Sequence, residues 1–170
     1  MAFIGFAAFP QGESGGLIEG QGWAYLASAP EGWVWDDSSL RRQGIEGLFY
    51  KKGVVFNPTM LHMYISPTVK KTGGPPSLGD FIAADRESYM NAEPGMTVLD
   101  LAPYSPGMGY SYVLRDFDDS NEGFYQSVAY YEGEQAYFVF VLFCRSVEER
   151  KQERDAFLEL LDSFTYIRKE

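Results

Sequence analysis

A serine flanked by glycines is the first feature of this chain whose residue types could do chemistry. Gly12-Glu13-Ser14-Gly15-Gly16 fits the pattern G-x-S-x-G and looks like a serine-protease active-site loop. A nucleophile elbow needs a strand before the serine and a helix after it. The glycines that follow disfavour a helix, and the single histidine comes after the serine, whereas the trypsin-like order puts it first. The motif therefore indicates a linker.

The densest acidic run, residues 116–123, could bind a cation. A calcium loop of the EF type needs glycine at its sixth position and a bidentate glutamate at its twelfth. Counting from Asp116 puts asparagine and serine there, and counting from Asp118 puts glycine and then alanine. Neither register fits. The run predicts a solvated hairpin turn, with adventitious cation binding as the alternative.

The chain contains one histidine, His62, and one cysteine, Cys144. These counts exclude zinc sites built from several thiolates or imidazoles. Cys144 ends the apolar run 138–144 and is expected to be a small buried hydrophobic residue. For His62 we expect a hydrogen-bonded or exposed side chain on a strand. No metal and no cofactor are predicted.

Hydrolysis by a pair of carboxylates is harder to exclude than a zinc site, because acid–base hydrolysis needs only two of them at a fixed separation. The sequence does not define their separation. A small hydrolase or small-molecule binder that uses carboxylates near the 104–110 loop therefore stays open as an alternative. The candidates are Glu13, Asp36, Asp37, Asp85, Glu87 and Asp100.

Aromatic residues are the other candidates, with 13 Phe, 12 Tyr and 3 Trp. Trp33 and Trp35 flank one valine, so on an extended segment both face the same way. Tyr104 and Tyr110 bracket a loop of small residues. Exposed Trp and Tyr beside flexible glycines make adaptable contact surfaces. These four residues are the predicted ligand- or partner-binding site; the alternative is that the two tryptophans cap the core.

The elements that must position these side chains belong to one domain. A length of 170 residues suits a single core, and we expect a leader over residues 1–22 and one domain over 23–170. Residues 10–22 are rich in glycine and predict a flexible leader. Residues 1–9 are apolar without a basic flank, which leaves a signal-peptide remnant or an edge strand.

The formal net charge of −10 disfavours binding to nucleic acid or to an anionic membrane. No stretch reaches the roughly 18 apolar residues of a membrane span.

Hydrophobic patterning and turn residues predict an α+β domain with helices packed on a central antiparallel sheet of about six to seven strands. Capping boxes at Ser77 and Ser146 indicate helices over 78–90 and 147–163, and the charged residues 148–154 are expected to be solvated. Asp36 to Ser39 offer caps for a short helical turn near 40–42. Strands are expected over 23–27, 47–50, 61–65, 97–101, 110–117, 123–131 and 135–144, the last one central.

The order of these motifs resembles that of the PsbP-like superfamily, which also includes Ran-binding regulators of the Mog type. The segment 23–36 resembles its opening strand followed by P-x-G-W, and the segments 47–53, 63–65 and 77–82 keep the order of such chains. The Tyr-rich hairpin 128–140 and the ending 157–164 do the same. The resemblance covers roughly residues 23–167 and rests on packing and turn motifs.

The resemblance implies a PsbP-like α/β/α sandwich. Known members of this type are accessory or binding proteins, and many small exported bacterial proteins of unknown role resemble them too. The family has no shared catalytic set. The resemblance therefore implies a non-catalytic accessory or binding domain that acts through a protein partner, in an extracytoplasmic place rather than in the cytoplasm. A cytoplasmic self-associating protein is a third hypothesis, and it predicts a symmetric apolar interface.

Overall fold

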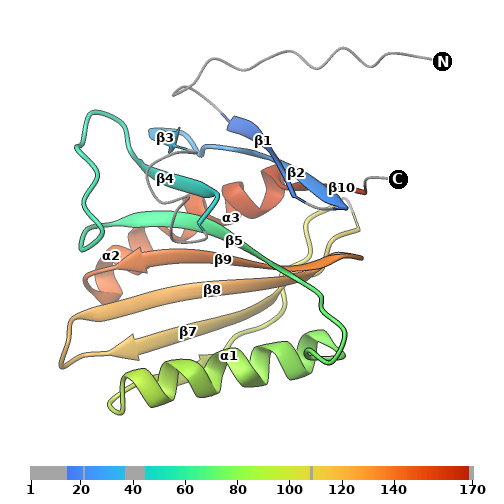
Figure 1. Ribbon diagram of the computed structural model, residues 1–170. Coiled ribbons are helices and arrows are strands. Elements are labelled where there is room, and N and C mark those ends of the chain that lie inside the picture. Colours follow the sequence, from blue (N-terminus) through green and yellow to red (C-terminus); the bar gives the residue numbers. More distant parts are fainter. Residues whose placement is uncertain (1–14, 21, 37–44, 108, 169–170) are drawn as a thin grey trace.

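The computed structural model describes residues 15–20, 22–36, 45–107 and 109–168 (Figure 1). These residues form strands and helices in the order β1 (Gly15–Glu19), β2 (Trp23–Ser28), β3 (Trp33–Asp36), β4 (Gly47–Lys51), β5 (His62–Val69), α1 (Leu78–Ala92), β6 (Thr97–Asp100), β7 (Val113–Asp119), β8 (Phe124–Glu132), β9 (Ala136–Cys144), α2 (Val147–Gln152), α3 (Arg154–Ser163) and β10 (Thr165–Arg168).

The main sheet has seven strands in the order β3-β4-β5-β9-β8-β7-β6, and every neighbouring pair is antiparallel. β9 lies in the middle and pairs with β5 and β8, which confirms the prediction that its near-continuous apolar run is central. A second sheet, β1-β2-β10, was not expected. The predicted class, α+β with a central antiparallel sheet, is confirmed.

The two faces of the main sheet are covered by different elements (Figure 1). α1 packs on one face, where Ile82 joins Phe117, Val128 and Val141 in a buried cluster. On the other face, α3 and the second sheet share a larger buried cluster with alternate residues of β9, including Phe138 and Phe140. Because successive side chains of a strand point to opposite faces, the same central strands supply both clusters.

Both helices start at the predicted capping serines, and in each case the serine half of the predicted capping box is present. The Asp80 backbone N–H donates to the Ser77 hydroxyl at 3.2 Å, and the Glu149 N–H donates to the Ser146 hydroxyl at 3.1 Å. The prediction of one helix over 147–163 is wrong, because the chain breaks at Glu153 into α2 and α3. The break lets Arg150 of α2 face β7 while Phe157 of α3 faces the core.

Several segments differ from the expected pattern. For the leader over residues 1–22, the sequence allowed either a flexible or a strand-like segment. Residues 15–19 form the strand β1, so the flexible interpretation is wrong there. β3 and β10 are strands that were not predicted, and β7 begins at Val113 instead of residue 110. The 12–14 part of the glycine-serine motif and the helical turn near 40–42 lie outside the described residues.

Among the described helices, none combines the length and the apolar character needed to cross a membrane.

Candidate functional site

A cavity of about 250 Å³ lies between α1, the end of β5 and the segment that joins them. Its lining is mostly apolar. Within that lining, the Phe81 ring stacks on the Tyr137 ring with centroids 4.6 Å apart. The Tyr137 hydroxyl donates to the Pro75 carbonyl at 3.0 Å and holds the joining segment against the sheet. The lining residues are Thr68, Val69, Lys70, Lys71, Gly74, Pro75, Phe81, Ala84, Asp85 and Tyr137.

Asp85 gives this cavity one acidic group. Its carboxylate accepts a hydrogen bond of 2.6 Å from the Tyr130 hydroxyl. Burial raises the pKa of Asp85 above its ordinary value, and the bond from Tyr130 opposes that rise. The result is a carboxylate held in place on one side and poorly solvated, facing a largely apolar space.

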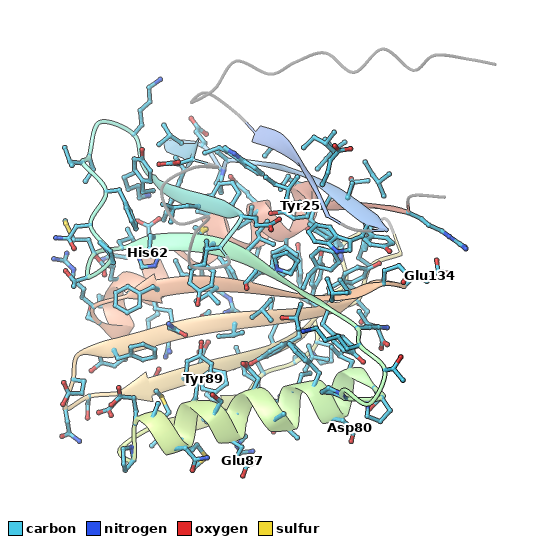
Figure 2. All side chains as sticks on the ribbon, in the orientation of Figure 1. Tyr25, His62, Asp80, Glu87, Tyr89 and Glu134 are labelled. Carbon is cyan, nitrogen blue, oxygen red and sulfur yellow. The ribbon has the colours of Figure 1, made fainter. Side chains whose placement is uncertain are left out.

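The tyrosines beneath α1 form a polar layer next to Asp85. Burial raises the pKa of Tyr64 to about 12, and it also raises the pKa values of Tyr89 and Tyr130. The Tyr89 hydroxyl donates to the Gln126 side chain at 3.1 Å. Figure 2 shows Tyr89 pointing from α1 toward the sheet, while Glu87 points away from it. The raised pKa values keep these phenols neutral at pH 7, and the hydroxyls of Tyr89 and Tyr130 act as hydrogen-bond donors.

A second hollow, of about 140 Å³, lies beside the loop between β4 and β5. The loop exposes apolar side chains: Val55 is 89% exposed and Val54 is 43% exposed. At the edge of the hollow, the Arg145 guanidinium pairs with the Glu149 carboxylate at 3.2 Å. The lining residues are Tyr50, Lys51, Val54, Val55, Phe56, Asn57, Met60, Leu61, Arg145 and Glu149.

The structure buries both tryptophans that the sequence offered as contact residues. Trp33 is 3% exposed and Trp35 is 7% exposed, and both belong to the larger cluster. The Trp35 ring packs edge-on against Phe49, with centroids 5.0 Å apart. Lys51 Nζ lies 4.5 Å from the centre of the Trp33 ring. Both tryptophans therefore cap the core, which is the alternative interpretation of their spacing. Little of either ring is exposed for contact with a partner.

Tyr104 and Tyr110 are half-buried and hold the 104–110 loop to the rest of the chain. The Tyr104 hydroxyl donates to Asp162 at 2.6 Å, and this bond raises the pKa of Tyr104 to about 12. The Tyr110 hydroxyl accepts from the Tyr166 backbone N–H at 3.1 Å. The described residues of this loop, 104–107, 109 and 110, line neither of the two cavities above. Their role in binding stays a prediction.

The acidic run 116–123 is not a solvated turn along its whole length. Asp116 and Asp118 lie within β7, and both pair with Arg150; the Asp116 contact is 3.4 Å. Asp119 is 3% exposed and accepts from the Asn121 N–H at 2.9 Å. Arg150 is 8% exposed, which also corrects the expectation that residues 148–154 are solvated. The buried part of this run fixes α2 to the sheet.

His62 and Cys144 have structural surroundings. His62 Nδ1 donates to the Met60 carbonyl at 2.7 Å, its ring stacks on Phe143 with centroids 5.0 Å apart, and burial lowers its pKa. Burial raises the pKa of the Cys144 thiol to about 12. Within residues 15–20, 22–36, 45–107 and 109–168, no group of three or more His, Cys, Asp or Glu side chains is placed to hold a metal ion.

Sequence reasoning named Asp85 only as one of six carboxylates and did not single out Val55, Phe81 or Tyr137. The pair Val54-Val55 directly after Gly53 is an apolar pair in a turn, and this signal could have marked the β4–β5 loop. No comparable signal joins Tyr137 to Phe81, because these residues meet only through the packing of α1 on β9.

Comparison with known proteins places the fold. No family model matches the chain. No curated protein matches it. The solution structure of cyanobacterial PsbP (CyanoP) from Synechocystis sp. PCC 6803 is similar over 96% of this chain and 99% of that chain, with a TM-score of 0.57 and 12% identity. A crystal structure from Bacteroides thetaiotaomicron matches 86% of this chain and 46% of that chain, with a TM-score of 0.41 and 14% identity. The chain therefore has a PsbP-like fold.

Proposed function

We propose that this protein is a non-catalytic accessory or binding domain that acts through contact with a protein partner outside the cytoplasm. The observation that carries the proposal is the exposed apolar loop between β4 and β5. The PsbP-like fold supports the accessory role, since known proteins of this type are accessory or binding proteins. Membership of the wider superfamily with its Mog-type members is part of this proposal.

The β4–β5 loop has the composition of a small protein-binding surface. Its tip exposes Val54 and Val55 to water, and Phe56 and Met60 line the hollow behind it. Burying one valine side chain is worth about 1.5 kcal/mol. The charged pair Arg145–Glu149 borders the hollow. An apolar centre with a polar rim is the usual anatomy of a protein interface.

Two engineered variants test this surface. Val55→Asp places a charge at the loop tip, and Leu99→Asp places the same charge at another exposed apolar residue, which is 61% exposed on β6. The tagged full chain and both variants are captured from fractionated cells of the source organism, and bound proteins are identified by mass spectrometry. We expect a stoichiometric partner from an extracytoplasmic fraction with wild type and Leu99→Asp, and at least a tenfold loss with Val55→Asp.

A protein recovered without any partner would contradict the accessory role. Recovery of the same partner by Val55→Asp would show that the partner-binding surface is not the β4–β5 loop. A chain found in the cytosol would contradict the extracytoplasmic assignment.

Small-molecule binding is the second candidate function. The observation that favours it is the cavity under α1 with Asp85 in its wall. This cavity lies on the α1 face of the sheet, whereas Tyr104 packs against the cluster on the other face. The carboxylate that supports this candidate is therefore Asp85, not one near the 104–110 loop.

A further inference from the structure

The cavity under α1 combines an apolar wall with one carboxylate. Val69, Pro75 and the Phe81–Tyr137 ring pair provide the apolar surface. Its volume of about 250 Å³ is below the roughly 300–1,000 Å³ of sites for drug-sized ligands. A ligand that fills it is therefore a small organic molecule with a compact apolar body.

Asp85 has unused capacity for a hydrogen-bond donor or a cation. A carboxylate has about four acceptor positions, and the bond from Tyr130 uses one of them. Among the described residues, no lysine or arginine forms an ion pair with Asp85. A half-buried carboxylate that lacks a cation gains the most from a positively charged partner, since the low dielectric strengthens the attraction.

Two lysines also line the cavity, and neither forms an ion pair with Asp85 among the described residues. Lys70 Nζ pairs with the Glu132 carboxylate at 2.6 Å and lies 4.7 Å from the centre of the Tyr137 ring. Lys71 is exposed on the joining segment. The formal net charge of −10 also favours the approach of cations over anions.

We propose that the cavity between α1 and residues 68–75 binds a small organic amine, with the protonated nitrogen at the Asp85 carboxylate and the apolar body against Phe81 and Val69. The proposal deepens the second candidate function and is independent of the partner surface at the β4–β5 loop. Tyr130 is a positioning residue in this site, because its hydroxyl fixes the orientation of the carboxylate.

Three probes of similar size and different charge test the ligand class by isothermal titration of the full chain at pH 7.5. They are 2-phenylethylamine, a cation; phenylalanine, a zwitterion; and 3-phenylpropanoate, an anion. We expect the amine to bind most tightly and the anion most weakly. Tightest binding of the anion would assign recognition to the lysines and overturn the proposal, and so would an absence of heat from all three probes at millimolar concentration.

Variants on one helix separate recognition from overall charge. Asp85→Asn keeps the shape and removes the charge, and Glu87→Gln removes one charge from an exposed residue of the same helix. A charge-assisted hydrogen bond is worth about 1.5–3 kcal/mol, so we expect amine binding to weaken about tenfold to a hundredfold in Asp85→Asn. Glu87→Gln should bind within about twofold of wild type.

A cavity-filling variant, Ala84→Met, locates the site. The longer side chain occupies the space on α1 beside Asp85, and we expect the binding of the amine to be lost. Thermal unfolding of each variant checks that the fold is retained. Equal amine affinity in wild type and Asp85→Asn would overturn the proposal, and so would equal affinity in a folded Ala84→Met variant; neither result would bear on the protein partner.

Discussion

The two faces of the main sheet are built differently. On the α3 face, Phe157, Leu160, Leu161 and Phe164 are each 0% exposed and pack with the aromatic rings of β2 and β9. On the α1 face, Ile82 is the one residue of α1 that is buried, and the space below the helix holds tyrosine hydroxyls, Asp85 and a cavity. The α3 face has the packing that stabilises a fold, and the α1 face has the polar groups and free space that a ligand needs.

The largest expected effect concerns the aromatic packing on the α3 face. Phe157→Ala removes a fully buried ring from the α3 face and should lower the free energy of unfolding by about 3–5 kcal/mol. Phe81→Ala on the α1 face should cost only about 1–2 kcal/mol, because that ring is half-buried. Urea unfolding of both variants measures the difference. Equal losses would show that the two faces contribute alike.

The next effect concerns the charges that fix α2 to the sheet. Arg150→Ala leaves Asp116 and Asp118 without their main cation and should cost about 2–4 kcal/mol, since an uncompensated buried charge is expensive. Lys151→Ala is the matched control. Its pair with Glu148 is exposed and 3.9 Å long, so we expect a change below about 0.5 kcal/mol. A small loss in Arg150→Ala would mean that the network adds little stability.

The smallest effect is a pH dependence on the α1 face. The pKa of Asp85 is raised in the folded chain, so the folded state binds its proton more tightly than the unfolded state does. This carboxyl therefore lowers stability as pH rises from its ordinary pKa through its raised folded pKa, and the loss is complete above that window. Asp85→Asn should then be more stable than wild type at pH 7, because the variant carries no buried carboxylate that loses its proton.

The same variant should lose this advantage in acid. Below the ordinary pKa of an aspartate the wild-type carboxyl is protonated in both states, so the two proteins should unfold at similar temperatures. Melting curves from pH 3 to pH 7 measure the trend. A gain that grows as pH falls would contradict the raised pKa.

Much of the fold follows from local sequence signals. The capping serines Ser77 and Ser146 start helices where expected, and the apolar run 136–144 is the central strand. The strands β3 and β10 were missed because each has four residues, too few for a clear period. The break at Glu153 was missed because residues 147–163 contain no glycine or proline that would mark it.

The candidate site was less predictable than the fold. Asp85 was one acidic residue among several, and nothing local distinguishes it from Glu87, two positions further along the same helix. The difference arises from rotation on the helix: Asp85 meets Tyr130 of β8, while Glu87 points away from the sheet (Figure 2). Trp33 and Trp35 were predicted to face the same way, and the structure buries both.

The sequence by itself determined the class of this protein: its helix starts, its alternating strands, its central strand and its acidic charge. These are local or additive properties, set by neighbours a few residues apart. Only the tertiary structure decided which carboxylate borders a cavity, which arginine is buried and which valine is exposed. Those outcomes depend on the pairing of β5 with β9 and on the packing of α1 and α2 over the sheet, which join residues far apart in the chain.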